Sequence, residues 1–243
     1  MAKGAAHAQS WQVVDAVLPE LLVPQKGGLS APIDQLPAIE SPKTLGLWTN
    51  LAGDCSKQLS VIRDKVADWT DRLAGGQLPP RWGWVSYTTQ LWARLRYGLG
   101  CNASGADELL SQEDEGGQLR PLYRRMLPLL GVNRNIKAAW RHLPTGFGGI
   151  GLKRLFHEAA ISRVNLFLQH YSTPSLLGRK LTMTLEALQI EAGLNRCPLT
   201  HPFHPIGPLL TPSWARSFWE CLDRLNWGLH IDYPSQPLPR DQD

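Results

Sequence analysis

The chain has 243 residues, of which 43% are hydrophobic, so it is long enough to bury a sizeable core. Its mean hydropathy of -0.23 and the lack of a long apolar run argue against a membrane span. The four cysteines are widely spaced and the first residues lack the apolar core of a signal peptide. We therefore expect an intracellular protein, in the cytoplasm or nucleus, with reduced thiols.

The first fifty residues favour strands and loops. Leu21–Val23 and Thr44–Trp48 are short runs of strand-compatible residues, and the prolines between them exclude a long helix. We expect a small β element here.

Helices are expected from residue 53 onward, because apolar residues recur at spacings of three and four. The first helix, ending at Gly75-Gly76, carries Leu59, Ile62, Val66, Trp69 and Leu73. The second carries Val85, Thr88, Trp92, Leu95 and Leu99. Further helices are predicted over Arg120–Leu127, Arg134–His142, Leu152–Tyr171, Ser175–Ala192 and Ser213–Trp227. The expected fold is therefore mostly α, with a small N-terminal β element.

The formal charge of +4 is unevenly distributed. Between Gln118 and His157 the chain has eight basic residues and no acidic residue, directly after an acidic segment at Asp107–Glu115. The basic residues are Arg120, Arg124, Arg125, Arg134, Lys137, Arg141, Lys153 and Arg154. A positive surface of this kind attracts phosphates and releases counterions. We interpret the eight side chains as phosphate contacts for a nucleic acid; the alternative is a solvated helix face.

No catalytic set emerges from the sequence. It has no Gly-x-Ser-x-Gly elbow, no phosphate-binding P-loop, no His-Glu-x-x-His and no Asp-Asp pair. Gly146–Gly151 is rich in glycine but lacks the preceding strand of a dinucleotide-binding fingerprint. Cys197, His201, His204 and Cys221 are zinc-ligand types at a non-standard spacing in a proline-rich loop. We expect no catalytic residue, metal site or cofactor in this chain.

The ten tryptophans mostly fall on or beside apolar stripes, which is typical of core residues. Trp140 differs, because it lies within the basic stretch beside Arg141. It is the tryptophan best suited to stack on a base or a sugar.

Several segments, taken in order, resemble one protein family. Ser41–Trp48 resembles the "LG" strand segment that follows the catalytic palm in reverse transcriptases of the non-LTR retrotransposon type. Leu95–Leu99 and Leu127–Asn135 resemble parts of the following thumb. Leu143–Leu155 resembles a glycine-rich motif further downstream. The resemblance covers residues 33–171 and rests on the shared order of these segments.

The resemblance, the helical spacing and the polar, proline-containing last residues together predict a domain organisation. Residues 1–52 would form a palm-edge β element, 53–172 a thumb-like helical domain, 173–230 a C-terminal helical extension and 231–243 a disordered tail. The implied function is binding of an RNA or RNA–DNA template-primer duplex.

The resemblance transfers no catalytic residue. The family's Tyr-x-Asp-Asp-like turn lies N-terminal to the "LG" segment, and the residues before Ser41 contain no such motif. We therefore expect a fragment of an RNA-directed DNA polymerase that is inactive alone. Mg²⁺ is expected only for a full-length relative, and a protein partner would supply the palm.

Other functional classes also fit the sequence. A small enzyme would assemble its site from His142, His157 and the acidic segment. A helical protein-interaction module would expose Trp214, Trp219 and Trp227. A degenerate retroelement reading frame would have no cellular role.

Overall fold

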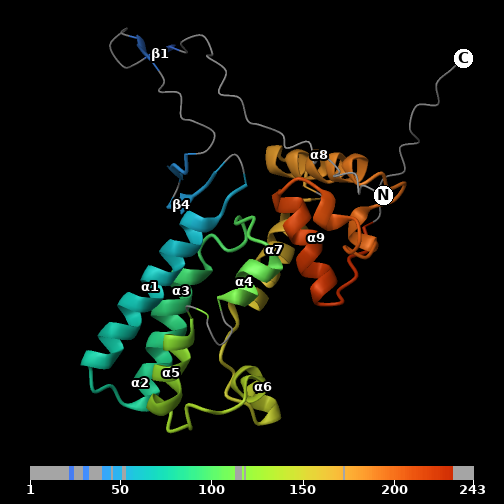
Figure 1. Ribbon diagram of the computed structural model, residues 1–243. Coiled ribbons are helices and arrows are strands. Elements are labelled where there is room, and N and C mark those ends of the chain that lie inside the picture. Colours follow the sequence, from blue (N-terminus) through green and yellow to red (C-terminus); the bar gives the residue numbers. More distant parts are fainter. Residues whose placement is uncertain are drawn as a thin grey trace, which may run out of the picture.

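The computed structural model describes residues 22–24, 30–32, 40–44, 46–50, 53–112, 117, 119–171 and 173–231. Within these residues the chain is mostly helical, with two short antiparallel strand pairs toward the N-terminus (Figure 1). This confirms the predicted fold class. Among the described helices, none is both long and apolar enough to cross a membrane. The tail predicted after residue 231 lies outside the described residues.

The N-terminal β element consists of two small hairpins. β1 (Leu22–Pro24) pairs with β2 (Ser30–Pro32), and β3 (Lys43–Thr44) pairs with β4 (Leu47–Trp48). The run of strand-compatible residues at Thr44–Trp48 forms a hairpin and not a single strand, since Thr44 pairs with Leu47 across a tight turn. Gly46 adopts a φ of 88°, a left-handed conformation that glycine reaches without a steric penalty.

Helix α1 (Ser56–Gly75) confirms the first predicted apolar stripe. All five residues of that stripe are buried, and the Asp54 carboxylate accepts a hydrogen bond from the backbone N–H of Ser56 at 2.8 Å. The opposite face carries the charged residues, including an exposed ion pair between Asp68 and Arg72.

The second predicted helix forms, but its buried face differs from the prediction. α2 (Pro80–Ser86), a π-helical turn η1 (Tyr87–Leu91) and α3 (Trp92–Arg96) follow one another without a break. The π turn inserts one extra residue into the helix and rotates the face before it. As a result Tyr87 and Leu91 are fully buried, whereas Val85, predicted to be buried, is exposed.

The middle of the chain contains shorter helices. α4 (Ala106–Ser111) is followed by α5 (Arg120–Leu129) and α6 (Ala138–His142). α6 begins four residues later than predicted. The glycine-rich segment after it is a tight loop, as expected, and contains the short 3-10 turn η2 (Thr145–Phe147).

Three helices form the C-terminal part. They are α7 (Leu155–His170), α8 (Leu176–Glu191) and α9 (Trp214–Arg224), with the short turns η3 (Pro198–Thr200) and η4 (Gly207–Leu209) in the irregular segment before α9. The helix predicted over Leu152–Tyr171 placed Lys153 and Arg154 in its first turn. Because α7 begins at Leu155, both residues precede the helix. The Ser175 and Ser213 hydroxyls cap α8 and α9 by accepting backbone N–H groups.

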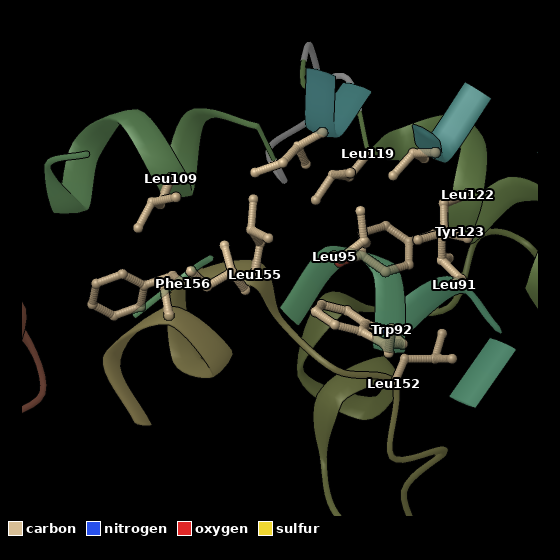
Figure 2. Packing of buried hydrophobic residues seen from close by; sticks show 14 of the residues in the cluster. Leu91, Trp92, Leu95, Leu109, Leu119, Leu122, Tyr123, Leu152, Leu155 and Phe156 are labelled. Carbon is tan, nitrogen blue, oxygen red and sulfur yellow. The ribbon is translucent and has the colours of Figure 1, made fainter. Parts of the chain in front are cut away.

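The helices bury two hydrophobic clusters. In the first, α3 faces α5 and the segment entering α7; Figure 2 shows Trp92 and Leu95 beside Tyr123 and Leu152. The second lies between the end of α7, α8, α9 and the irregular segment before α9. Because α7 and α9 contribute to both clusters, they join the α1–α5 bundle to the α8–α9 end of the molecule (Figure 1).

One arginine lies inside this junction. Arg163 of α7 is 0% exposed. Its Nη2 donates to the carbonyls of Asn102 (2.8 Å) and Ser104 (2.7 Å), and its Nη1 donates to the Ser217 carbonyl (3.3 Å) and to Cys221 Sγ (2.9 Å). A buried cation requires such acceptors to replace its hydration. Arg163 therefore ties α7 to α9 and to the loop after α3.

Candidate nucleic-acid interface

Helix α5 presents one basic face next to the first hydrophobic cluster. Pro121 lies in its first turn, where the missing N–H has no helical partner. Arg120 and Arg124 are four residues apart and therefore lie on the same side of the helix. Tyr123 lies between them in sequence and is 1% exposed. The core thus fixes the backbone from which these two arginines extend.

Helix α6 and the following loop form a compact unit. The backbone N–H of Leu152 donates to the Arg141 carbonyl (2.9 Å), and that of Gly151 donates to the Leu143 carbonyl (2.9 Å), so the loop returns along the helix. Gly149 makes this return feasible, since a Cβ there would lie 2.0 Å from the Leu143 carbonyl oxygen. The return brings Arg154 to the same region as α6.

These elements enclose a cavity of about 430 Å³. Its lining contains six of the eight predicted phosphate contacts, and among the described lining residues there is no carboxylate. We call this cavity the basic groove; its cations are Arg120, Arg124, Arg134, Lys137, Arg141 and Arg154. The structure therefore gathers onto one site residues that span 35 positions of the sequence.

The floor of the basic groove is built by aromatic and imidazole rings. The Arg141 guanidinium lies 5.2 Å from the centre of the Tyr123 ring, and Tyr123 meets His142 edge to face at 5.2 Å. A cation at this position over an aromatic face is attracted by the ring quadrupole. Tyr123 thus helps to fix the position of Arg141 in the groove.

His142 adds no charge to the groove near neutral pH. Burial lowers the pKa of His142 to about 4, and the positive charges of Arg154 and Arg141 act in the same direction. Its Nδ1 lies 2.8 Å from the Leu152 carbonyl, which can only accept, so Nδ1 carries the hydrogen. This bond holds the ring against the returning loop, and the positive charge of the groove comes from its arginines and lysine.

Two of the eight predicted contacts lie outside the groove lining. Arg125 is exposed on α5 but does not line the cavity. Lys153 places its Nζ 3.5 Å from the Glu158 carboxylate and 5.7 Å from the centre of the Trp92 ring. Its backbone N–H donates to the Tyr87 hydroxyl at 2.9 Å. Lys153 therefore has an internal partner for its charge, and it joins the groove wall to the core.

The charge pattern alone missed the uncharged residues of the groove. Tyr123, Asn135 and His142 also line the cavity. Helical spacing contains the signal for Tyr123, because residues three and four apart share a helix face and Arg120, Tyr123 and Arg124 have this spacing.

The described residues of the other candidate sites are distributed over several elements of the fold. Within the described residues, His, Cys, Asp and Glu side chains form no group of three or more that could hold a metal ion. The described groove lining includes His142 but not His157, although the charge of His157 contributes to lowering the pKa of His142. Residues 113–115 of the acidic segment lie outside the described residues, and Asp107 pairs with Arg224.

The tryptophan-rich surface expected of an interaction module is largely internal. Trp219 is 1% exposed and donates its indole N–H to the His201 carbonyl at 2.7 Å. Trp214 is partly buried and donates to the Gly100 carbonyl at 2.6 Å. The interaction-module alternative required Trp214 and Trp219 to be exposed, and they are not; the burial of Trp219 is instead as expected for a tryptophan on an apolar stripe, and Trp227 is 44% exposed.

Comparisons of the sequence with protein-family models, with curated proteins and with solved structures find no match. The geometry of the basic groove is accordingly the basis for a functional proposal.

Proposed function

We propose that the basic groove binds the sugar-phosphate backbone of a nucleic acid, an RNA or RNA–DNA duplex, independently of its sequence. The observation that carries this proposal is the convergence of six cations on one cavity without a carboxylate among its described lining. Phosphate contacts from Arg and Lys supply most of the affinity of sequence-independent binding.

The composition of the groove favours a polyanion. Five of its six cations are arginines, whose planar guanidinium matches two phosphate oxygens at once. The exposed ion pairs Asp68–Arg72 and Asp107–Arg224 lie outside the groove. Like charges held close together repel, and an anionic ligand removes that repulsion.

The resemblance to reverse transcriptases supports the same partner. A thumb grips the template-primer duplex largely through its backbone, and the chain would do so as a fragment of an RNA-directed DNA polymerase. The catalytic Asp motif of the family has no counterpart in the sequence. A primer-extension assay with Mg²⁺ and dNTPs should therefore give no incorporation by this chain alone, and incorporation would contradict this part of the proposal.

The test of the groove uses two neighbouring arginines. Arg124 and Arg125 are adjacent and exposed on α5, but only Arg124 lines the cavity. Affinity for a fluorescent RNA–DNA duplex is measured by anisotropy at two salt concentrations. Arg124→Ala should weaken binding and lower the slope of log affinity against log salt by roughly 0.9, whereas Arg125→Ala should leave both nearly unchanged.

Two results would contradict the proposal. Duplex binding without a salt slope would exclude phosphate contacts as its source. Equal losses for Arg124→Ala and Arg125→Ala would show that a diffuse positive surface, and not the groove, holds the ligand.

A further inference from the structure

Two large aromatic side chains are exposed on the α6 unit that forms one wall of the basic groove. Trp140 of α6 is 50% exposed and Phe147 of the following turn is 77% exposed. α6 also supplies Arg141 and His142 to the groove. The charged and the aromatic surfaces therefore belong to one short segment of the chain.

Both aromatic residues are attached to a well-held backbone. The Trp140 carbonyl accepts the backbone N–H of Ile150 at 3.1 Å, and the Phe147 N–H donates to the Pro144 carbonyl at 3.0 Å. Gly148 adopts a φ of 80°, which ends the turn directly after Phe147. The two rings thus project from a fixed loop, so ordering the backbone costs little additional entropy when a ligand binds.

Exposed aromatic rings on the same short segment as a groove cation suit nucleotides whose bases are unpaired. In a continuous duplex both faces of a base are covered by its neighbours, so only an unpaired base offers a face to an aromatic ring. Stacking of a base on an aromatic side chain contributes about 1–3 kcal/mol by alanine substitution and tolerates any base. The groove cations would hold the adjacent phosphates of the same strand.

We infer that Trp140 and Phe147 form a stacking platform for unpaired nucleotides that extend from a duplex held in the basic groove. This inference rests on the proposed function, and it narrows the ligand to a nucleic acid with a single-stranded extension.

The test compares three ligands and measures affinity by anisotropy. They are a blunt RNA–DNA duplex, the same duplex with a short unpaired extension, and the same duplex with an abasic extension of equal length. The unpaired extension should tighten binding about fivefold or more for each stacked base, and the abasic extension should not. Both extensions carry the same phosphates, so their difference isolates the bases.

Variants assign the effect to the two rings. Trp140→Ala and Phe147→Ala should each reduce the gain from the extension and leave affinity for the blunt duplex nearly unchanged. Phe147→Tyr should retain the gain, because the ring remains. Trp82→Ala is the matched control, since Trp82 is 58% exposed but belongs to α2 and not to the α6 unit.

The possible results distinguish failure of the stacking platform from failure of the proposed groove. A blunt duplex that binds with a salt slope, together with no gain from the unpaired extension, overturns the platform and leaves the groove proposal intact. An equal gain from the abasic extension, or a gain that survives both alanine variants, also overturns the platform. Failure of all three ligands to bind overturns the proposed function itself.

Discussion

Arginines occupy two opposite environments in this molecule. Arg163 is completely buried, and its terminal nitrogens are surrounded by backbone carbonyls and one thiol. The arginines of the basic groove border a cavity whose described lining has no carboxylate. The protein itself supplies the acceptors for Arg163, whereas the groove arginines line a cavity that we propose receives the phosphates of a ligand. Position in the fold, and not residue type, separates an arginine that holds the structure from one available to a ligand.

The largest effect on stability is expected from Arg163→Met. The change leaves the carbonyls of Asn102, Ser104 and Ser217 without this donor, and each such buried acceptor costs about 1–3 kcal/mol. We expect the free energy of unfolding, from urea titration followed by tryptophan fluorescence, to fall by roughly 3 kcal/mol or more. Duplex affinity per folded molecule should not change. A decrease in the free energy of unfolding below about 1 kcal/mol would show that the buried contacts of Arg163 do not stabilise the fold more than an exposed arginine does.

A smaller loss of stability is expected from Gly149→Ala. The added Cβ would meet the Leu143 carbonyl oxygen at 2.0 Å, so the loop must shift, at a cost of about 1–3 kcal/mol. Because this loop positions Arg141 and Arg154, duplex affinity should also fall although no charge is lost. Gly146→Ala is the matched control, since a Cβ there has no described neighbour within 4 Å. Unchanged affinity in Gly149→Ala would show that the loop does not position the groove.

Removing groove cations should affect binding far more than folding. Arg124, Arg134 and Lys137 are exposed, so the triple alanine variant should change the unfolding free energy little, by about 0.5 kcal/mol or less for each residue. The salt slope of duplex affinity should fall by roughly 0.9 for each phosphate contact removed. Arg179→Ala combined with Arg196→Ala, both exposed outside the groove, is the control. A large loss of stability in the triple variant would show that these residues, like Arg163, stabilise the fold.

The smallest effect concerns His142 and pH. Its folded pKa of about 4 lies below the value of about 6.5 expected when unfolded. The unfolded chain therefore takes up a proton first, and this histidine makes stability fall as the pH drops from about 6.5 to about 4. His142→Asn should reduce that dependence, seen as closer urea midpoints at pH 7 and pH 5. The pKa of His157 is also lowered, so part of the dependence should remain.

The sequence predicted regular amphipathic elements better than irregular ones. The α1 stripe was correct in every residue, because an unbroken helix keeps its period over 20 residues. The stripe of the next helix was wrong at Val85, because the π turn at Tyr87–Leu91 adds one residue to the repeat. The strand-compatible residues at Thr44–Trp48 predicted a small β element, but local propensity did not indicate that Thr44 would pair with Leu47.

For the site, local charge predicted most of the cations but not their surroundings. Arg125 and Lys153 could not be separated from the others, since their exclusion depends on helix rotation and on a contact with Glu158. The buried Arg163 was overlooked, although the spacing of Ala159, Ala160 and Phe167 on α7 places it in the middle of an apolar face. A charge at such a position indicates a buried cation that requires acceptors.

The π turn connects the first hydrophobic cluster to the segment that carries Lys153 and Arg154. Through it the Tyr87 hydroxyl meets the backbone N–H of Lys153, the residue that directly precedes Arg154 of the groove. Deleting one residue from this turn would restore an ordinary helix, rotate Tyr87 away by about 100° and release that wall of the groove. A helix distant in sequence from the groove would then affect its shape, so a change inside the bundle should alter the affinity of the proposed site without altering any charge.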